Sequence, residues 1–538
     1  MKMITRRRAG VEFRCDDPSL TPYAGLALVA ETVRVLDATA VLDRFLGPLK
    51  LRRHGVSGGE LLVALGESML VGGDFFSDLD TLRADAAGAV LRTVAATPAA
   101  TTALGLARRF RPEQLTALPT AQAELVGRHV AALPRRRRRA LLGKRPTIDV
   151  DPTDVEVYGT QKERIGWTYA GVRAGRPVLV TWAEAGVILT GELLAGDQDP
   201  RPTAPNWMRQ AVAALPKGTK RPRVRCDSGL FSGDGAWAAV DAEADFAIAA
   251  ARNAAVCRAI QGIPKDAWRP ATGMRGAAVA VADYVPEDWP KDTRMIVRRV
   301  RIEANEISQD PRSRRRRTFD PAQLQLALEG AVSHAYAYYP IVTNLKGPAQ
   351  AIEAWFRERA QIEERIKDTK LGMALRHLPS GFAVANQVWM WAAFLALTLS
   401  VTLQALSGND HPHRAHGKRL RRELIVVPAR VVRHARRLVV RLCPRAAGRA
   451  VPGRLPAPAR PSHSGWLNRK PPAIWPLPLY RKGGGPTCLG EASTPRNPPP
   501  RGSECGSSPT TPIPPSPPSL ILLHQARLPS SGGNTTPA

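Results

Sequence analysis

The chain has 538 residues, and its 77 Lys and Arg residues outnumber its 47 Asp and Glu residues, which gives a formal net charge of +30 at pH 7. An ordinary soluble surface of mixed charge does not account for so large a positive excess. The charge indicates a polyanionic partner, above all nucleic acid. Aromatic residues make up only 6% of the chain, which favours contacts with a duplex backbone over a platform for unpaired bases.

Cysteine spacing and the apolar segments further limit the class of protein to which this chain can belong. None of the six cysteines forms a CxxC pair, so neither a zinc ribbon nor a thioredoxin-like site is expected. The N-terminal residues lack the apolar run of a signal peptide. Residues 388–403 are strongly apolar but fall short of about 18 residues, so we expect a buried helix and no membrane contact, with a transmembrane span as the alternative. We therefore expect a cytoplasmic, DNA-associated protein.

Residues 1–142 are predicted to form a helical N-terminal DNA-binding region. Amphipathic runs between residues 20 and 142 are separated by Gly, Pro and Asp, which is typical of short helices joined by turns. An arginine run at residues 135–139 closes the region where a linker would approach DNA. Plain helical packing without a DNA contact is the alternative.

Residues 143–406 are predicted to form an α/β domain with a mixed sheet, because strand-like runs alternate with short helical ones. Two of the strands end in an aspartate: Asp151 follows TIDV, and Asp227 ends VRCD. A strand end holds such a side chain rigidly, and the following loop leaves it exposed. Residues 254–332 interrupt the alternation and are predicted to be a β-rich insertion with a polybasic loop.

Residues 355–370 have a helical pattern with one acid between two cations. At about 100° per residue, one face carries four side chains within roughly 60° of one another: Phe356, Arg359, Glu363 and Lys370. Glu364 points roughly 140° away from Arg359 by the same arithmetic. Such a face suits a metal site whose substrate is a phosphate backbone, because the acid binds the metal and the cations bind the polyanion.

A helix that carries Glu363 and packs on the sheet would complete a cluster of three carboxylates with Asp151 and Asp227. Carboxylates at such short distances repel one another unless hard divalent cations bind them. We therefore expect two Mg²⁺ ions, with Mn²⁺ as the alternative, to activate a water or 3′-hydroxyl and stabilise the leaving oxygen. Taken alone, an Asp after a strand is most often a turn former or helix cap. Four other acids compete for the two aspartate positions: Asp149, Asp154, Glu156 and Asp234.

The C-terminal part changes character twice. Residues 407–445 are basic and amphipathic and are predicted to be a helical segment, either a DNA-contacting helix or a solvated face. Residues 446–538 are predicted to be a disordered Pro-rich tail, since 21 of the 48 prolines lie from Val451 onward. Such a composition cannot bury enough apolar surface to offset the entropy of ordering.

The spacing Phe356-x2-Arg359-x3-Glu363-x6-Lys370 resembles the Tyr-x2-Arg-x3-Glu-x6-Lys signature of DDE transposases from bacterial insertion sequences. Three further stretches resemble the strand before that signature and the two aspartate motifs: VTNL at 342–345, DVDPTD at 149–154 and RCDSGLFS at 225–232. Their wording is most similar to insertion-sequence family 1380. The resemblance covers roughly residues 20–442.

This resemblance implies an RNase H-like catalytic core with a β insertion between the second Asp and the Glu. It implies that Asp151, Asp227 and Glu363 are the catalytic, metal-binding acids. It also implies that Arg359 and Lys370 contact phosphates of the transposon end.

Phe356 departs from the family's Tyr, because it keeps the ring but loses the hydroxyl, and we expect weaker binding of the transposon end. Relatives stabilise a flipped base with an aromatic side chain of the insertion. Trp268 and Trp289 are the candidates for that role here, although we prefer a core or turn role for each.

The resemblance implies a cut-and-paste transposase that binds double-stranded DNA at terminal inverted repeats, hydrolyses phosphodiester bonds there and joins the 3′-hydroxyls to target DNA. Synapsis of two ends implies at least a homodimer, acting at the bacterial nucleoid. The rivals are an RNase H-like metal-dependent nuclease without strand transfer and an inactive, transposase-derived DNA-binding protein. Because family members end soon after residue 442, the Pro-rich remainder suggests a frameshift or read-through.

Overall fold

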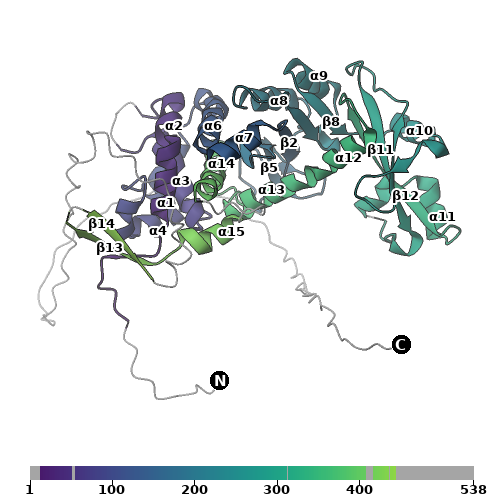
Figure 1. Cartoon of the computed structure of the whole chain (residues 1–538). Helices are drawn as coiled ribbons and strands as arrows, with labels where there is room; N and C mark the ends of the chain where they lie inside the picture. Colours follow the sequence, from purple (N-terminus) through teal and green to yellow (C-terminus); the bar gives the residue numbers. More distant parts are fainter. Residues whose placement is uncertain (1–12, 51–54, 312, 408–415, 436, 444–538) are drawn as a thin grey trace, which may run out of the picture. The chain divides into compact units, whose positions relative to one another are not determined.

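Figure 1 shows the computed structural model of the chain, which describes residues 13–50, 55–311, 313–407, 416–435 and 437–443. The predicted disorder of residues 446–538, and the frameshift hypothesis for their origin, lie outside the described residues. The first twelve residues of the predicted N-terminal region lie outside them too.

The described part of the N-terminal region between residues 26 and 142 consists of helices joined by turns and loops. Its helices are α1 (Leu26–Leu36), α2 (Ala38–Leu46), α3 (Gly58–Val71), α4 (Asp78–Ala84), α5 (Ala100–Ala107), α6 (Pro112–Ala132) and α7 (Arg135–Leu142). Local sequence explains where several begin. A capping box opens α3, because Ser57 accepts a bond from the Glu60 N–H and the Glu60 side chain accepts one from Ser57. A proline at the first position opens α6.

The long apolar segment forms helix α14 (Ala383–Leu406), which packs against α3, α6 and β6. Of the described residues, this is the one helix long and apolar enough to cross a membrane, yet its apolar window is wholly buried inside the protein. Its polar side chains have partners there: Gln122 of α6 donates to the Thr398 hydroxyl at 3.1 Å, and Thr402 lies 2.8 Å from the His129 ring nitrogen. Helix α14 is therefore a buried core helix of this protein.

The central sheet is mixed, as the alternation of strands and helices predicts. Its main strands are β2 (Thr147–Pro152), β5 (Arg173–Trp182), β6 (Val187–Ala195), β7 (Arg223–Cys226) and β8 (Asp245–Ala249), in the spatial order β6-β5-β2-β7-β8. β2 runs antiparallel to β5 but parallel to β7, and β7 runs parallel to β8. Two short strands, β3 (Val155–Glu156) and β4 (Gly166–Trp167), pair with β5. Helices α8 (Ala204–Ala213) and α9 (Gly233–Asp241) lie between strands in the chain.

Residues 254–332 extend this sheet and also add helices. Strands β9 (Arg269–Pro270), β10 (Ala277–Ala282) and β11 (Arg294–Glu303) join it through β12 (His334–Thr343), which pairs with β8. Helices α10 (Ala254–Gln261) and α11 (Pro321–Leu328), with a 3-10 turn at Arg314–Thr318, complete the insertion. The predicted β-rich insertion is thus a mixed one.

The predicted helix over residues 355–370 is interrupted. α12 (Ala349–Arg357) and α13 (Gln361–Gly372) follow one another across a 3-10 turn at Glu358–Ala360 (Figure 1). The tighter turn changes the rotation between the two helices. Phe356 and Glu363 therefore do not share the single face that an unbroken helix would give them.

The prediction of a helical segment over residues 407–445 is wrong for most of its described part. A short helix α15 (Gly417–Leu420) and a π-turn (Arg421–Ile425) lead into a hairpin of β13 (Ala429–His434) and β14 (Arg437–Leu442), with β13 also pairing with β1 (Leu20–Thr21). Pro428 cannot donate within a helix. The β-branched pairs Val431–Val440 and Val432–Val439 favour the pleated surface instead.

Two glycines test the packing between the sheet and α14. A Cβ at Gly191 in β6 would collide with the Val178 carbonyl oxygen and lie 2.7 Å from the Phe394 ring, whereas a Cβ at Gly127 in α6 would meet nothing within 4 Å. We expect Gly191→Ala to lower the free energy of unfolding by about 1–3 kcal/mol through overpacking. We expect Gly127→Ala to raise it by about 0.5–1 kcal/mol. Urea denaturation of both variants measures the two free energies of unfolding. Equal effects of the two substitutions would contradict the close packing of Gly191 against Val178 and Phe394.

Candidate active site

Asp151 and Asp227 lie at the same edge of the sheet. β2 and β7 are parallel neighbours, with Val150 opposite Cys226, so the residues that follow these two lie side by side at the carboxyl ends of the strands. Both side chains are half-buried. The Asp227 carboxylate also accepts the Gly229 N–H at 3.0 Å and caps the next turn. The structure therefore brings the two predicted aspartates together.

Glu363 reaches the same place from another part of the chain. It lies exposed in the first turn of α13 and lines, with Asp151, a hollow of about 390 Å³. The remaining lining residues are Thr153, Ile366, Lys367, Lys370, Leu371 and Arg376. Two of the three predicted acids thus face one hollow with cations on its wall.

The pKa of Asp151 reflects its surroundings. Burial, together with the negative charges of Asp227 and Glu363, raises the pKa of Asp151 to about 6 against the opposing effect of Arg359. Charges affect one another's pKa strongly only at short range. The charges of Asp227 and Glu363 therefore both act on Asp151.

Arg359 and Lys370 lie at this cluster, each with a protein partner. Arg359, in the turn between α12 and α13, donates from Nη1 to the Asp151 carboxylate at 3.2 Å. Lys370 donates from Nζ to the Asp154 carbonyl oxygen at 2.6 Å, and burial lowers the pKa of Lys370. Both cations therefore line the place where the acids meet.

Phe356 is not brought to the hollow. It is half-buried and packs, with Trp355, against a small apolar cluster that includes Ile296 of β11 and Ile341 of β12. We call strands β9 to β12 the insertion sheet. The two tryptophans of the insertion also have packing roles: Trp289 is only 7% exposed and lies 4.9 Å from the Phe231 ring, and Trp268 is half-buried with the Arg299 guanidinium 4.2 Å from its ring.

The competing acids are occupied elsewhere or stand apart. Asp149 is fully buried and accepts two bonds from Arg225, at 2.6 and 2.9 Å. Asp154 pairs with Arg176 at 2.7 Å. Glu156 and Asp234 are exposed, on β3 and in the first turn of α9.

Arg225 supports the site without lining the hollow, and the sequence analysis missed it. Besides its two bonds to Asp149, it donates to the backbone carbonyl of Trp355 in α12, and its side chain is 2% exposed. This one guanidinium therefore links β2, β7 and the helix that leads to Glu363. A signal was present in the sequence, because a charged residue with an apolar neighbour on each side, Asp149 or Arg225, stands two positions before each aspartate.

The donor set suits a hard divalent cation. Carboxylate oxygens are the ligands that Mg²⁺ and Mn²⁺ prefer. A bound cation would offset both the burial and the neighbouring negative charges that raise the pKa of Asp151. In the described part of the chain, no three His, Cys, Asp or Glu side chains are already gathered as a metal site. Binding an ion would therefore require these carboxylates to converge and Asp151 to exchange its contact with Arg359.

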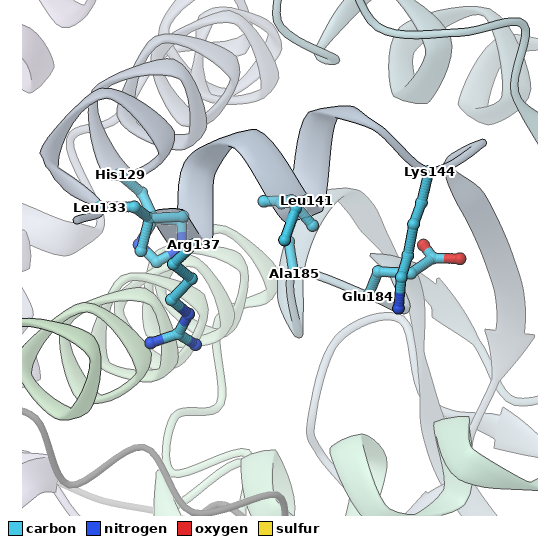
Figure 2. Close-up of a pocket in the computed structure, with 8 residues that line it drawn as sticks. His129, Leu133, Arg137, Leu141, Lys144, Glu184 and Ala185 are labelled. Atoms are coloured by element: carbon cyan, nitrogen blue, oxygen red, sulfur yellow. The ribbon is translucent and has the colours of Figure 1, made fainter. Parts of the chain in front are cut away.

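A second hollow, of about 140 Å³, lies beside α7 and is drawn in Figure 2. Lys144 and Glu184 lie near one another at one end, and Arg137 projects at the other. The Glu184 carboxylate accepts the Thr147 N–H at 2.9 Å at the start of β2. None of the three predicted acids lines this hollow, so we assign it no part in the site.

Comparison with known proteins identifies the family of this chain. The family model described as transposase DDE domain group 1 matches residues 4–453. No curated protein matches the chain. Among solved structures, the cryo-EM structure of the piggyBac transposase synaptic complex with hairpin DNA is similar over 76% of this chain and 79% of that chain, with 8% sequence identity and a TM-score of 0.38. So distant a likeness carries no conclusion, and the assignment depends on the family model.

Proposed function

This chain belongs to the DDE transposases of domain group 1 and carries out DNA transposition, and we propose that it does so by cut and paste, with Asp151, Asp227 and Glu363 as its catalytic acids. The observation that carries the proposal is that β2 and β7 end side by side at Asp151 and Asp227, and that α13 brings Glu363 to the hollow beside Asp151. Asp151 and Glu363 share a hollow, and the charge of Asp227 acts on Asp151.

We infer an RNase H-like core around these acids. The order β6-β5-β2-β7-β8, with antiparallel neighbours on one side of β2 and parallel neighbours on the other, supports this inference. The aspartate motifs and the spaced signature support a finer membership in insertion-sequence family 1380, a bacterial origin and action at the nucleoid.

Members of the family use divalent metal ions, and Asp151, Asp227 and Glu363 would hold Mg²⁺ or Mn²⁺ in this chain. Bound ions would supply a lowered pKa for the attacking water or 3′-hydroxyl and a stabilised leaving oxygen. The protein's own part is positioning. The sheet fixes two carboxylates, α13 supplies the third, and cations at the hollow hold the phosphodiester in place.

The cations have separate roles in this proposal. Arg359 already contacts Asp151, so its guanidinium is within reach of a phosphate at the acids and suits such an oxyanion geometrically. Lys367 is exposed on the same wall and adds a point charge. Lys370, tied to the Asp154 carbonyl, holds α13 to the loop after β2. Two ends must be held together for cut and paste, so we propose a homodimer on DNA.

Strand transfer is the test of this function. We expect the full-length protein, given linear DNA with the element's terminal repeats and a target plasmid, to join 3′ ends to the target in Mg²⁺ or Mn²⁺. EDTA should stop the reaction, because the carboxylates then have no cation to bind. Gel analysis of joined products measures the outcome. Cleavage without joining would favour the nuclease rival, and DNA binding without cleavage the inactive one.

A further inference from the structure

Three strongly exposed aromatic side chains lie within residues 158–169, the segment that follows β2 and β3. Tyr158 is 86% exposed, Trp167 is 63% exposed and Tyr169 is 79% exposed. Single exposed aromatic residues need no explanation, but three within twelve residues mark an interaction surface. We call Tyr158, Trp167 and Tyr169 the aromatic edge.

The backbone of the aromatic edge is held in place. Arg173 of β5 donates to the carbonyl oxygens of Gly159 at 2.9 Å and Thr160 at 3.1 Å, which fixes the loop after Tyr158. Trp167 pairs with Arg173 across β4 and β5. Tyr169 sits in the tight turn between these strands, which Gly171 closes with a φ of +74°. Trp167 and Tyr169 are therefore presented by an ordered hairpin, and Tyr158 by a loop that Arg173 holds.

Cations accompany the rings. Arg317 of the insertion donates to the Tyr169 hydroxyl at 2.8 Å, with its guanidinium 5.7 Å from the ring centroid. Arg315 and Arg164 are exposed nearby in the chain. The acid of this segment, Glu163, is engaged in accepting the Ala383 N–H at 2.8 Å. Exposed rings together with guanidinium groups are the combination that binds unpaired nucleotides by stacking and backbone attraction.

The aromatic edge also lies close to the acids along the chain. Seven residues lead from Asp151 to Tyr158, so their Cα atoms are at most about 24 Å apart. Thr153, at the start of this stretch, lines the hollow with Asp151 and Glu363. Cutting one strand leaves its bases paired, so the rings would act on nucleotides that separate from the complementary strand at the cut end.

We propose that Tyr158, Trp167 and Tyr169, with Arg317, form a stacking surface for unpaired nucleotides of the DNA strand next to the cleavage site. This role depends on the proposed function for its biological meaning, but binding itself does not require catalysis. The 6% aromatic content that argues against a stacking platform is an average, and it conceals this local concentration of rings.

The test compares single-stranded with duplex DNA. We expect Trp167→Ala in the full-length protein to weaken binding of a fluorescent single-stranded oligonucleotide about 5- to 100-fold, since stacking contributes about 1–3 kcal/mol per base. Duplex binding of the same length should change less than twofold. Fluorescence anisotropy in EDTA and in moderately high salt, which weakens backbone attraction, gives both affinities.

Two variants serve as controls. Trp237→Ala removes a tryptophan of α9 that is 44% exposed and should leave single-strand affinity unchanged. Trp167→Phe keeps a ring and should retain affinity within about threefold. If Trp167→Ala changes neither affinity, or lowers both equally, the proposal is overturned. A change in the sedimentation of the DNA-free protein would instead identify a contact between protein chains and also overturn it.

The two proposals can fail separately. If single-strand binding depends on the rings but no strand transfer occurs, the cut-and-paste function is contradicted and the stacking surface is still supported. If strand transfer occurs but Trp167→Ala binds single-stranded DNA as tightly as the parent protein, the stacking surface is contradicted and the cut-and-paste function is still supported.

Discussion

Glu363→Gln should lower DNA cleavage and strand transfer by about 1,000-fold or more, a loss of about 4 kcal/mol of transition-state stabilisation, while DNA binding stays within about twofold. The amide keeps the size of the side chain but removes the negative charge that a metal needs. Glu363 is exposed, so the change should not disturb folding. Rates of end cleavage and joining, measured with saturating protein, report the effect.

Glu364→Gln is the matched control for this variant. Glu364 is the next residue, in the same first turn of α13 and also exposed, but it does not line the hollow with Asp151. We expect its variant to keep activity within about threefold of the parent. Equal loss in both variants would assign the effect to the helix turn rather than to a ligand, and full activity of Glu363→Gln would remove Glu363 from the site.

Arg225→Met should be the most destabilising substitution near the site. It leaves Asp149, a fully buried carboxylate, without the two bonds that Arg225 donates, and it also leaves the Trp355 carbonyl without this donor. Breaking a buried pair from one side costs about 3–5 kcal/mol. Urea denaturation followed by circular dichroism measures the loss.

Arg221→Met is the control, since the Arg221–Asp245 pair is 3.0 Å long but half-exposed, and its loss should cost less than about 1 kcal/mol. Removing both charges together, in Asp149→Leu with Arg225→Met, should recover most of the stability. A single variant that is as stable as the parent protein, or a double variant no better than the single one, would show that the pair does not hold the sheet.

The Arg225 variant should also depend on pH. Burial already raises the pKa of Asp149, and the bonds from Arg225 oppose that rise, so removing Arg225 raises the folded-state pKa further. A carboxyl whose pKa is higher in the folded than in the unfolded state favours folding at low pH and loses that contribution as pH rises through the folded-state pKa. Arg225→Met should therefore be less destabilised at pH 5 than at pH 8.

The parts of the fold that local sequence determines were predictable. Apolar runs that end in Asp151 and Asp227 indicated two strand ends, and the mixed sheet followed from the alternation of elements. The break at Glu358–Ala360 was not predictable, because it depends on how α12 docks on the insertion sheet rather than on helix propensity. The β13–β14 hairpin was missed for a similar reason, since β13 acquires a partner strand, β1, from the opposite end of the domain.

The candidate site shows the same division. Three acids could be chosen from spacing and from a family resemblance, whereas the pairing of Asp149 with Arg225 is a contact between strands that no local pattern reports. Exposure is also a property of the folded chain, so the aromatic edge was invisible in composition. Placement of Phe356 in an apolar cluster was likewise missed, because it needs the insertion sheet to exist.

The way Arg225 joins β2, β7 and α12 has a consequence for synthesis. The ribosome releases Asp151 roughly 200 residues before Glu363, which at 5–20 residues per second is on the order of 10–40 s. Until α12 emerges, Arg225 has no Trp355 carbonyl to bond, and the third acid does not yet exist. A polypeptide whose synthesis has not passed residue 363 therefore lacks both the Trp355 contact of Arg225 and the third proposed acid, so the proposed site is completed late in translation.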